Sequence, residues 1–177
     1  MKTTIYDLLK KDHRKVEGLL ERLVHSADAD DETRTSLINQ IRDDLIPHAR
    51  AEEAVFYNSL STIPEAKDLV RHGYVEHMEA ETLLRTLQGM NSVNADWTTV
   101  AKKLRDGILH HIEEEEGEIF TAAQALLIEE EAVAIGEAFT ELKDKIGDGT
   151  VVTSALELVA NIMPDRFATP FRNFLHK

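Results

Sequence analysis

Two short blocks with the same spacing constrain this chain more than any other feature. The segments 48–53 and 111–116 each begin with a histidine and end in two glutamates, with three residues between the histidine and the first glutamate. Residues four apart lie on the same face of an α-helix, so each block presents an imidazole and a carboxylate in one direction. An aromatic residue follows each histidine by nine positions, Tyr57 in the first block and Phe120 in the second.

Apolar residues recur at steps of three and four along most of the chain, which is the pattern of amphipathic helices. Only four prolines occur among the 177 residues, and leucine, glutamate, alanine and lysine, which favour helices, are plentiful. The pattern predicts an all-α fold with long helices over residues 4–25, 32–60, 64–88 and 97–127, and a further helix, or a continuation after a bend, over residues 132–146.

The four long helices contain an internal repeat. The segment Asp12–Glu17, an acid followed by a histidine and then a glutamate four residues later, has the same form as Glu76–Glu81. The two histidine–glutamate blocks repeat at almost the same offset. One helix pair cannot bury its apolar face alone, so we expect the two pairs to join in an up-down-up-down four-helix bundle.

The predicted turns, centred near residues 29–30, 62 and 93, bring four histidines to one level of this bundle. Each predicted helix places one histidine within about one helical turn (~5 Å) of a common slice through the core. Two glutamates lie one turn away. The six residues expected at this level are His13, His48, Glu52, His77, His111 and Glu115.

Buried carboxylates require partners, because an unpartnered charge in a core costs several kcal/mol. Protonated histidines are one solution, and bound cations, which use the imidazole lone pairs, are the better one. Mixed nitrogen and oxygen ligands suit iron, manganese or zinc, and two ions joined by carboxylates suit a redox-active di-iron centre in a bundle core. His110 has the same spacing to Glu114, but the apolar stripe favours His111. Glu53 and Glu116 are expected to be solvated or to orient the ligand imidazoles.

Composition narrows the remaining functions. The net charge of −13 disfavours nucleic acid and anionic membranes as partners. There is no cysteine, so any metal must be held by imidazole and carboxylate. No apolar run reaches membrane-spanning length, and the N-terminal segment lacks an apolar signal core, so a cytoplasmic location is expected. The acid excess lies before residue 150, which separates a bundle domain (1–147) from a C-terminal helical extension (148–177) expected to pack on the bundle.

The order of these histidines and glutamates resembles that of the hemerythrin-like, HHE cation-binding family over about residues 4–127. The segments Tyr6–Arg14 and His111–Phe120 resemble the two stretches by which the family is best known. The resemblance implies a non-haem di-iron centre. In that centre the four histidines would be terminal ligands, and Glu52 and Glu115 would bridge the two ions.

The chain departs from the oxygen-carrying hemerythrins at one position. Those proteins have a fifth histidine four residues before the one in the third helix, where this chain has Gly73. The departure counts against simple reversible oxygen carriage. Glu17, Glu81 or an exchangeable water is expected to fill the gap.

The leading hypothesis is a monomeric or homodimeric protein with two iron ions, or manganese or zinc in their place, that binds or reacts with dioxygen, peroxide or nitric oxide. One alternative is an iron- or oxygen-sensing or iron-buffering protein without turnover. The other is a structural helical bundle whose polar layer is only ion-paired.

Overall fold

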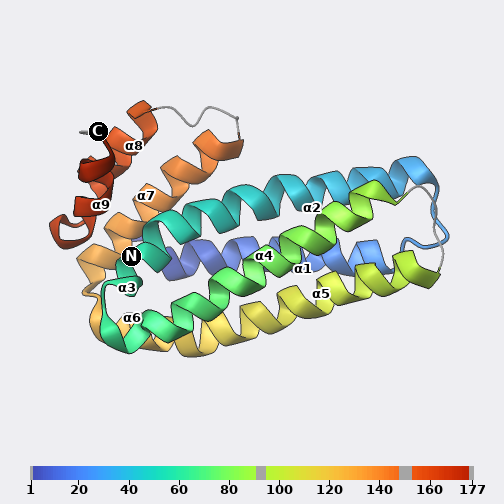
Figure 1. Ribbon diagram of the computed structural model, residues 1–177, viewed down its shortest axis with the longest axis horizontal. Coiled ribbons are helices and arrows are strands. Elements are labelled where there is room, and N and C mark those ends of the chain that lie inside the picture. Colours follow the sequence, from blue (N-terminus) through green and yellow to red (C-terminus); the bar gives the residue numbers. More distant parts are fainter. Residues whose placement is uncertain (1, 91–94, 148–152, 176–177) are drawn as a thin grey trace.

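Four long helices run side by side in alternating directions, as predicted (Figure 1). The computed structural model describes residues 2–90, 95–147 and 153–175. Within these ranges the bundle helices are α1 (Ile5–Val24), α2 (Asp31–Glu52), α4 (Lys67–Gly89) and α5 (Ala95–Glu114). The bundle is therefore the up-down-up-down arrangement that the repeat predicts.

Local sequence signals explain where the first two helices begin. Thr4 and Asp7 form a capping box at the start of α1, in which each side chain bonds the backbone N–H of the other residue. The Asp30 carboxylate caps α2 by accepting from the backbone N–H of Thr33 at 2.6 Å.

A turn of π-helix begins within each histidine–glutamate block, which corrects the expectation of α-helix up to residues 60 and 127. The π segments are η1 (Glu53–Tyr57) and η3 (Glu115–Ile119), and they continue into the short helices α3 (Asn58–Ser61) and α6 (Phe120–Leu126). A 3-10 turn, η2 (Pro64–Ala66), precedes α4.

The π turns explain why the aromatic residues nine positions after each histidine are buried. In a regular α-helix, nine residues at roughly 100° each would place Tyr57 and Phe120 about half a turn away from the histidine. A π turn accommodates one extra residue and so turns the following side chains back towards the histidine face. Tyr57 and Phe120 are accordingly 0% and 2% exposed.

The buried polar level divides the bundle core into two parts. On the glutamate side the core is rich in aromatic residues, which include Tyr6, Phe56 and Phe139. On the other side it consists mainly of leucine and isoleucine, with Trp97 as its large aromatic residue. The polar level thus lies between two apolar parts of the core.

The C-terminal helices extend the aromatic side of the core. They are α7 (Glu129–Gly147), α8 (Thr153–Ile162) and α9 (Asp165–Leu175). α7 packs against α1 and α2, α8 packs on α7, and α9 packs on α8 (Figure 1). Gly136 allows the close approach of α7, because a Cβ there would come within 2.9 Å of the Ile5 backbone nitrogen.

Two sequence predictions concern the C-terminal part. The further helix over residues 132–146 is confirmed as α7. The domain boundary predicted after residue 147 adjoins residues 148–152, which lie outside the described ranges. Within those ranges, no helix is both long and apolar enough to cross a membrane.

Candidate metal centre

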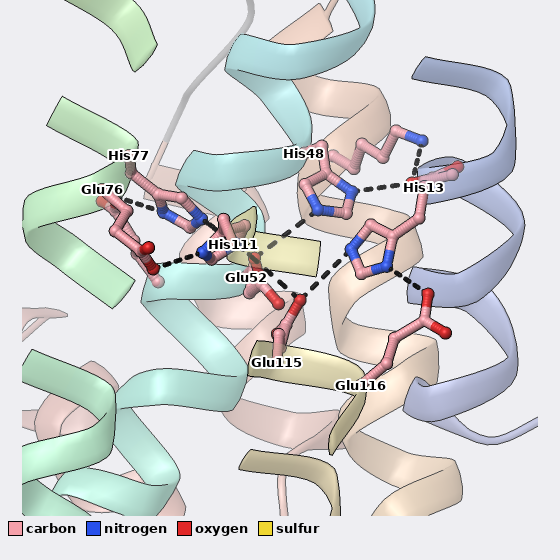
Figure 2. A network of polar contacts seen from close by, with 11 residues as sticks. His13, His48, Glu52, Glu76, His77, His111, Glu115 and Glu116 are labelled. Carbon is pink, nitrogen blue, oxygen red and sulfur yellow. Dashed lines mark hydrogen bonds and ion pairs between the residues drawn. The ribbon is translucent and has the colours of Figure 1, made fainter. Parts of the chain in front are cut away.

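Four buried imidazoles meet in the middle of the bundle, one from each long helix (Figure 2). They form two pairs. The rings of His13 and His48 have centroids 5.3 Å apart, and those of His77 and His111 are 4.6 Å apart. In the second pair the two Nε2 atoms lie 3.1 Å from each other, so both can direct a lone pair at a single point between them.

Two fully buried carboxylates lie between the histidine pairs. Glu52 Oε2 is 3.5 Å from Nε2 of His48 and 3.4 Å from Nε2 of His77. Glu115 Oε2 is 3.2 Å from Nε2 of His13 and 3.9 Å from Nε2 of His111. Each carboxylate therefore faces one histidine of each pair, which is the placement of a group that can bridge two ions.

The carboxylates of this inner cluster (His13, His48, Glu52, His77, His111 and Glu115) are not satisfied by its imidazoles. None of the four carboxylate oxygens has a hydrogen-bond partner among the described residues. His13 Nε2 also lacks one, since its contact with Glu115 is close but poorly aligned. Ligand atoms of Glu52, His77 and His111 all lie within 4.8 Å of one another. This donor set fits a divalent cation better than a self-contained polar layer.

A ring of four acids fixes the orientation of the imidazoles. Since an ionised carboxylate can only accept, each Nδ1–H donates and leaves the Nε2 lone pair directed inwards. The acid of each long helix, or of the π turn that continues it, holds the histidine of the next helix round the bundle. The four orienting acids are Asp12 to His48 (3.1 Å), Glu53 to His77 (3.0 Å), Glu76 to His111 (2.9 Å) and Glu116 to His13 (2.9 Å).

The sequence predicts this ring only in part. Glu53 and Glu116 take the orienting role, one of the two that their position suggests. Asp12 and Glu76 complete the ring without a sequence prediction, although both directly precede a core histidine in the repeat. That shared position was the available signal.

The electrostatics of the site prepare it for cations. Burial, together with the neighbouring His13, lowers the pKa of His48 to about 4, so this imidazole keeps its lone pair at neutral pH. Burial and the charge of Glu115 raise the pKa of Glu52 well above its usual value. Burial opposes the ionisation of Glu115, but Glu52 and His13 hold its pKa low. The two buried carboxylates thus differ in how readily they ionise, and a bound cation would favour the ionised form of both.

The structure directs Glu17 and Glu81 towards arginines. Glu17 lies 3.2 Å from the Arg14 guanidinium. Glu81 pairs with Arg50 at 2.5 Å and with Arg85 at 2.6 Å. Neither glutamate belongs to the group of ligand atoms that the structure brings together, and the space beside Gly73 is filled in another way.

Tyr57 occupies the space that a side chain at position 73 would need. A Cβ on Gly73 would lie 2.6 Å from the Tyr57 hydroxyl oxygen. The Tyr57 ring stacks on His77, with centroids 5.5 Å apart and planes 7° apart. Its hydroxyl is buried without a hydrogen-bond partner in the described part of the chain. The sequence shows Tyr57 only as the aromatic residue nine positions after His48, and the position of its unpartnered hydroxyl beside His77 depends on the packing of α2 and α4.

A small cavity lies on the aliphatic side of the histidines. Its volume is about 30 Å³, and its walls are the four imidazoles and side chains that include Val16, Ala80 and Ile108. A cavity of roughly 10–15 Å³ on the same measure holds one water, so this one admits only a very small molecule.

His110 and His111 separate as predicted. The His111 side chain is buried at the inner cluster, whereas the His110 side chain is 58% exposed and faces Glu114 at 3.2 Å.

Comparison with known proteins places these features in a family. The model of a family described as the hemerythrin HHE cation binding domain matches residues 4–123. A DNA nickase from Nostoc sp. is 28% identical over 142 residues, which cover 80% of this chain and 40% of the nickase. An uncharacterized hemerythrin-like protein from Schizosaccharomyces pombe is 27% identical over 143 residues, which cover 80% of this chain and 70% of that protein. No solved structure matches significantly.

Proposed function

Because this chain belongs to the hemerythrin HHE cation-binding family, we propose that its bundle holds two iron ions that bind or react with a small oxidant. The oxidant would be dioxygen, peroxide or nitric oxide. Iron of this kind would supply the electrons for such a reaction, and manganese or zinc are the alternatives that the same ligands could hold.

The two histidine pairs would each hold one ion. His13 and His48 would bind the first, and His77 and His111 the second, with Glu52 and Glu115 bridging the two. The observation that carries this assignment is the set of unpartnered carboxylate oxygens facing four inward Nε2 atoms. A bound pair of cations would remove the cost of burying those oxygens.

The size of the cavity supports a small ligand. The volume of about 30 Å³, enclosed by imidazoles, aliphatic side chains and charged groups such as Arg50 and Glu81, excludes bulky organic substrates. The buried hydroxyl of Tyr57 is on the opposite, aromatic side of the histidines, so it would be a hydrogen-bond donor only to a molecule that approaches the ions from that side.

The experiment is to purify the protein without chelator, count its metals and follow its optical spectrum. We expect about two iron ions per chain. The spectrum should change when the anaerobically reduced protein meets dioxygen, peroxide or nitric oxide. Retention of the metal without any optical change or turnover would contradict the reactive function.

Retained metal without optical change or turnover would favour iron sensing or iron buffering without turnover. The observation in its favour is the same set of buried, unpartnered groups, because loss of metal should loosen the apo bundle. A large difference in protease sensitivity between the metal-bound and metal-free protein would support it.

The Nostoc relative is named as a DNA nickase, and this chain spans 40% of that protein. We propose that this chain does not bind DNA by itself, because its net charge of −13 opposes contact with phosphates. Fluorescence anisotropy with a labelled duplex at low salt tests this point. The cytoplasmic location and the monomeric or homodimeric state also stay proposals, and gel filtration tests the second.

A further inference from the structure

One of the four orienting acids has a different environment from the other three. Each of those three pairs on its outer side with a permanent cation: Asp12 with Lys143, Glu53 with Arg50, and Glu116 with Arg14. Glu76 instead faces the imidazoles of His72 and His110 at 3.6 and 4.0 Å. A neutral imidazole supplies no positive charge, so the outer side of Glu76 differs in kind.

These imidazoles belong to a second cluster built from two adjacent helices. His72 and Glu76 are four residues apart on α4, and His110 and Glu114 are four residues apart on α5. Each pair therefore shares a helix face. One ligand atom from each of the four side chains lies within 4.8 Å of all the others.

The distances in this outer cluster (His72, Glu76, His110 and Glu114) suit a single tetrahedral ion. Zinc–nitrogen and zinc–oxygen bonds of about 2.0–2.2 Å place neighbouring ligand atoms of a tetrahedron roughly 3.4 Å apart. The contacts between histidine nitrogens and carboxylate oxygens lie on both sides of this value. Nε2 of His72 lies 3.3 Å from Oε2 of Glu114, and Nε2 of His110 lies 3.2 Å from Oε1 of the same residue. Oε1 of Glu76 lies 3.6 and 4.0 Å from the same two nitrogens.

Ion pairing alone explains this cluster less well. Both histidine side chains are 58% exposed, and exposed pairs of this kind contribute about 0–1 kcal/mol. One ligand is already fixed, because Glu76 is only 13% exposed and its Oε2 accepts from His111 Nδ1 at 2.9 Å. Its Oε1 is the atom turned towards His72 and His110. A cation there would place a positive charge beside Glu76, as Lys143 does beside Asp12.

We propose that His72, Glu76, His110 and Glu114 bind one divalent transition cation of the zinc type, outside the inner cluster. Two imidazoles and two carboxylates form a ligand set that such an ion prefers. The Glu76 carboxylate would then link this ion to His111 and so to the inner cluster. The outer site is argued from its own four side chains and does not depend on which metal the inner cluster holds.

Equilibrium dialysis of the purified, metal-loaded protein against buffered zinc, followed by a count of iron and zinc, tests the proposal. The wild type should bind one more zinc ion per chain than the double variant His72→Ala/His110→Ala, with iron unchanged in both. His25→Ala is the matched control, since His25 forms a single four-residue pair with Glu21 at 3.8 Å. This control should keep the extra zinc.

Glu114→Gln is a conservative second variant that touches neither the inner cluster nor the orienting acids. It should lose the extra zinc while its thermal unfolding stays close to that of the wild type. Equal zinc binding in the wild type and both outer variants would overturn the proposal, as would a wild type that takes up no extra zinc. If the protein purifies without iron, and the wild type still binds a zinc ion that these variants do not bind, the result would support the outer site and count against the proposed function.

Discussion

The inner and outer clusters are built from the same residue types at the same spacing, and they differ in burial. His110 and Glu114 precede His111 and Glu115 by one residue, which rotates them roughly 100° round the same helix. Glu115 is fully buried, whereas the side chain of Glu114 is 36% exposed. Water can solvate the outer carboxylates, and the inner ones have no such partner. A histidine four residues from a glutamate therefore identifies candidate ligands, and burial decides how strongly they need an ion.

Glu52→Ala should have the largest effect, because it removes a bridging group from the buried cluster. We expect loss of the inner ions, and a free energy of unfolding about 3–5 kcal/mol below that of the metal-bound wild type. Metal analysis and chemical denaturation measure both. Glu114→Ala, in the exposed cluster, should leave the inner ions in place, and an equal loss in both variants would remove the distinction between the clusters.

Acid should destabilise the metal-free protein through His48. The pKa of His48 in the folded state is about 4, below the ordinary value of 6.5. As the pH falls, His48 is therefore protonated in the unfolded chain before it is protonated in the folded one. Stability is then lost as the pH falls from about 6.5 to about 4, by about 3 kcal/mol at most. The stability difference between wild type and His48→Asn, measured at several pH values, isolates this contribution.

His72→Asn serves as the exposed control in the same series. A stability difference between wild type and His48→Asn that does not change between pH 7 and pH 4 would show that His48 is not buried as a neutral imidazole.

One of the orienting acids, Glu76, contacts both clusters, so its substitution should affect both. Glu53→Gln should weaken metal binding at the inner cluster by roughly 10–100-fold, since the amide holds His77 less firmly. Glu76→Gln should weaken the inner cluster similarly and the outer cluster as well. Competition with a chelator measures each affinity. Glu21→Gln is the control, because Glu21 belongs to neither cluster and pairs with His25 and Arg105.

Gly73→Ala should lower the free energy of unfolding by about 1–3 kcal/mol without removing a group that binds metal. The added Cβ would collide with the Tyr57 ring, which packs against His77. Gly18→Ala is the matched control: its Cβ meets nothing within 4 Å, so it should stabilise α1 by roughly 0.5–1 kcal/mol. Equal effects of the two variants would show that Tyr57 does not fill the space beside Gly73.

The helices and the common level of the core histidines follow from sequence because both depend on periodicity and chain length alone. The apolar steps of three and four predict four antiparallel helices, and the turn positions bring the six inner residues together. The choice of His111 over His110 follows from the same stripe.

Features that depend on packing between helices did not follow from the sequence. The π turns after Glu52 and at Glu115 depend on how the aromatic core packs around them. The contact from Asp12 to His48 requires the relative rotation of two helices, which no single-helix pattern contains. Glu17 and Glu81 share the spacing of ligands, yet both lie beside arginines on neighbouring turns or helices.

Iron content in variants of two adjacent histidines tests most directly whether the buried cluster is the metal centre. His111→Ala should lose the inner ions, whereas His110→Ala should keep about two iron ions per chain, as in the wild type. If both variants retain the wild-type iron content, or if the wild type carries no transition metal, the buried cluster is not the metal centre.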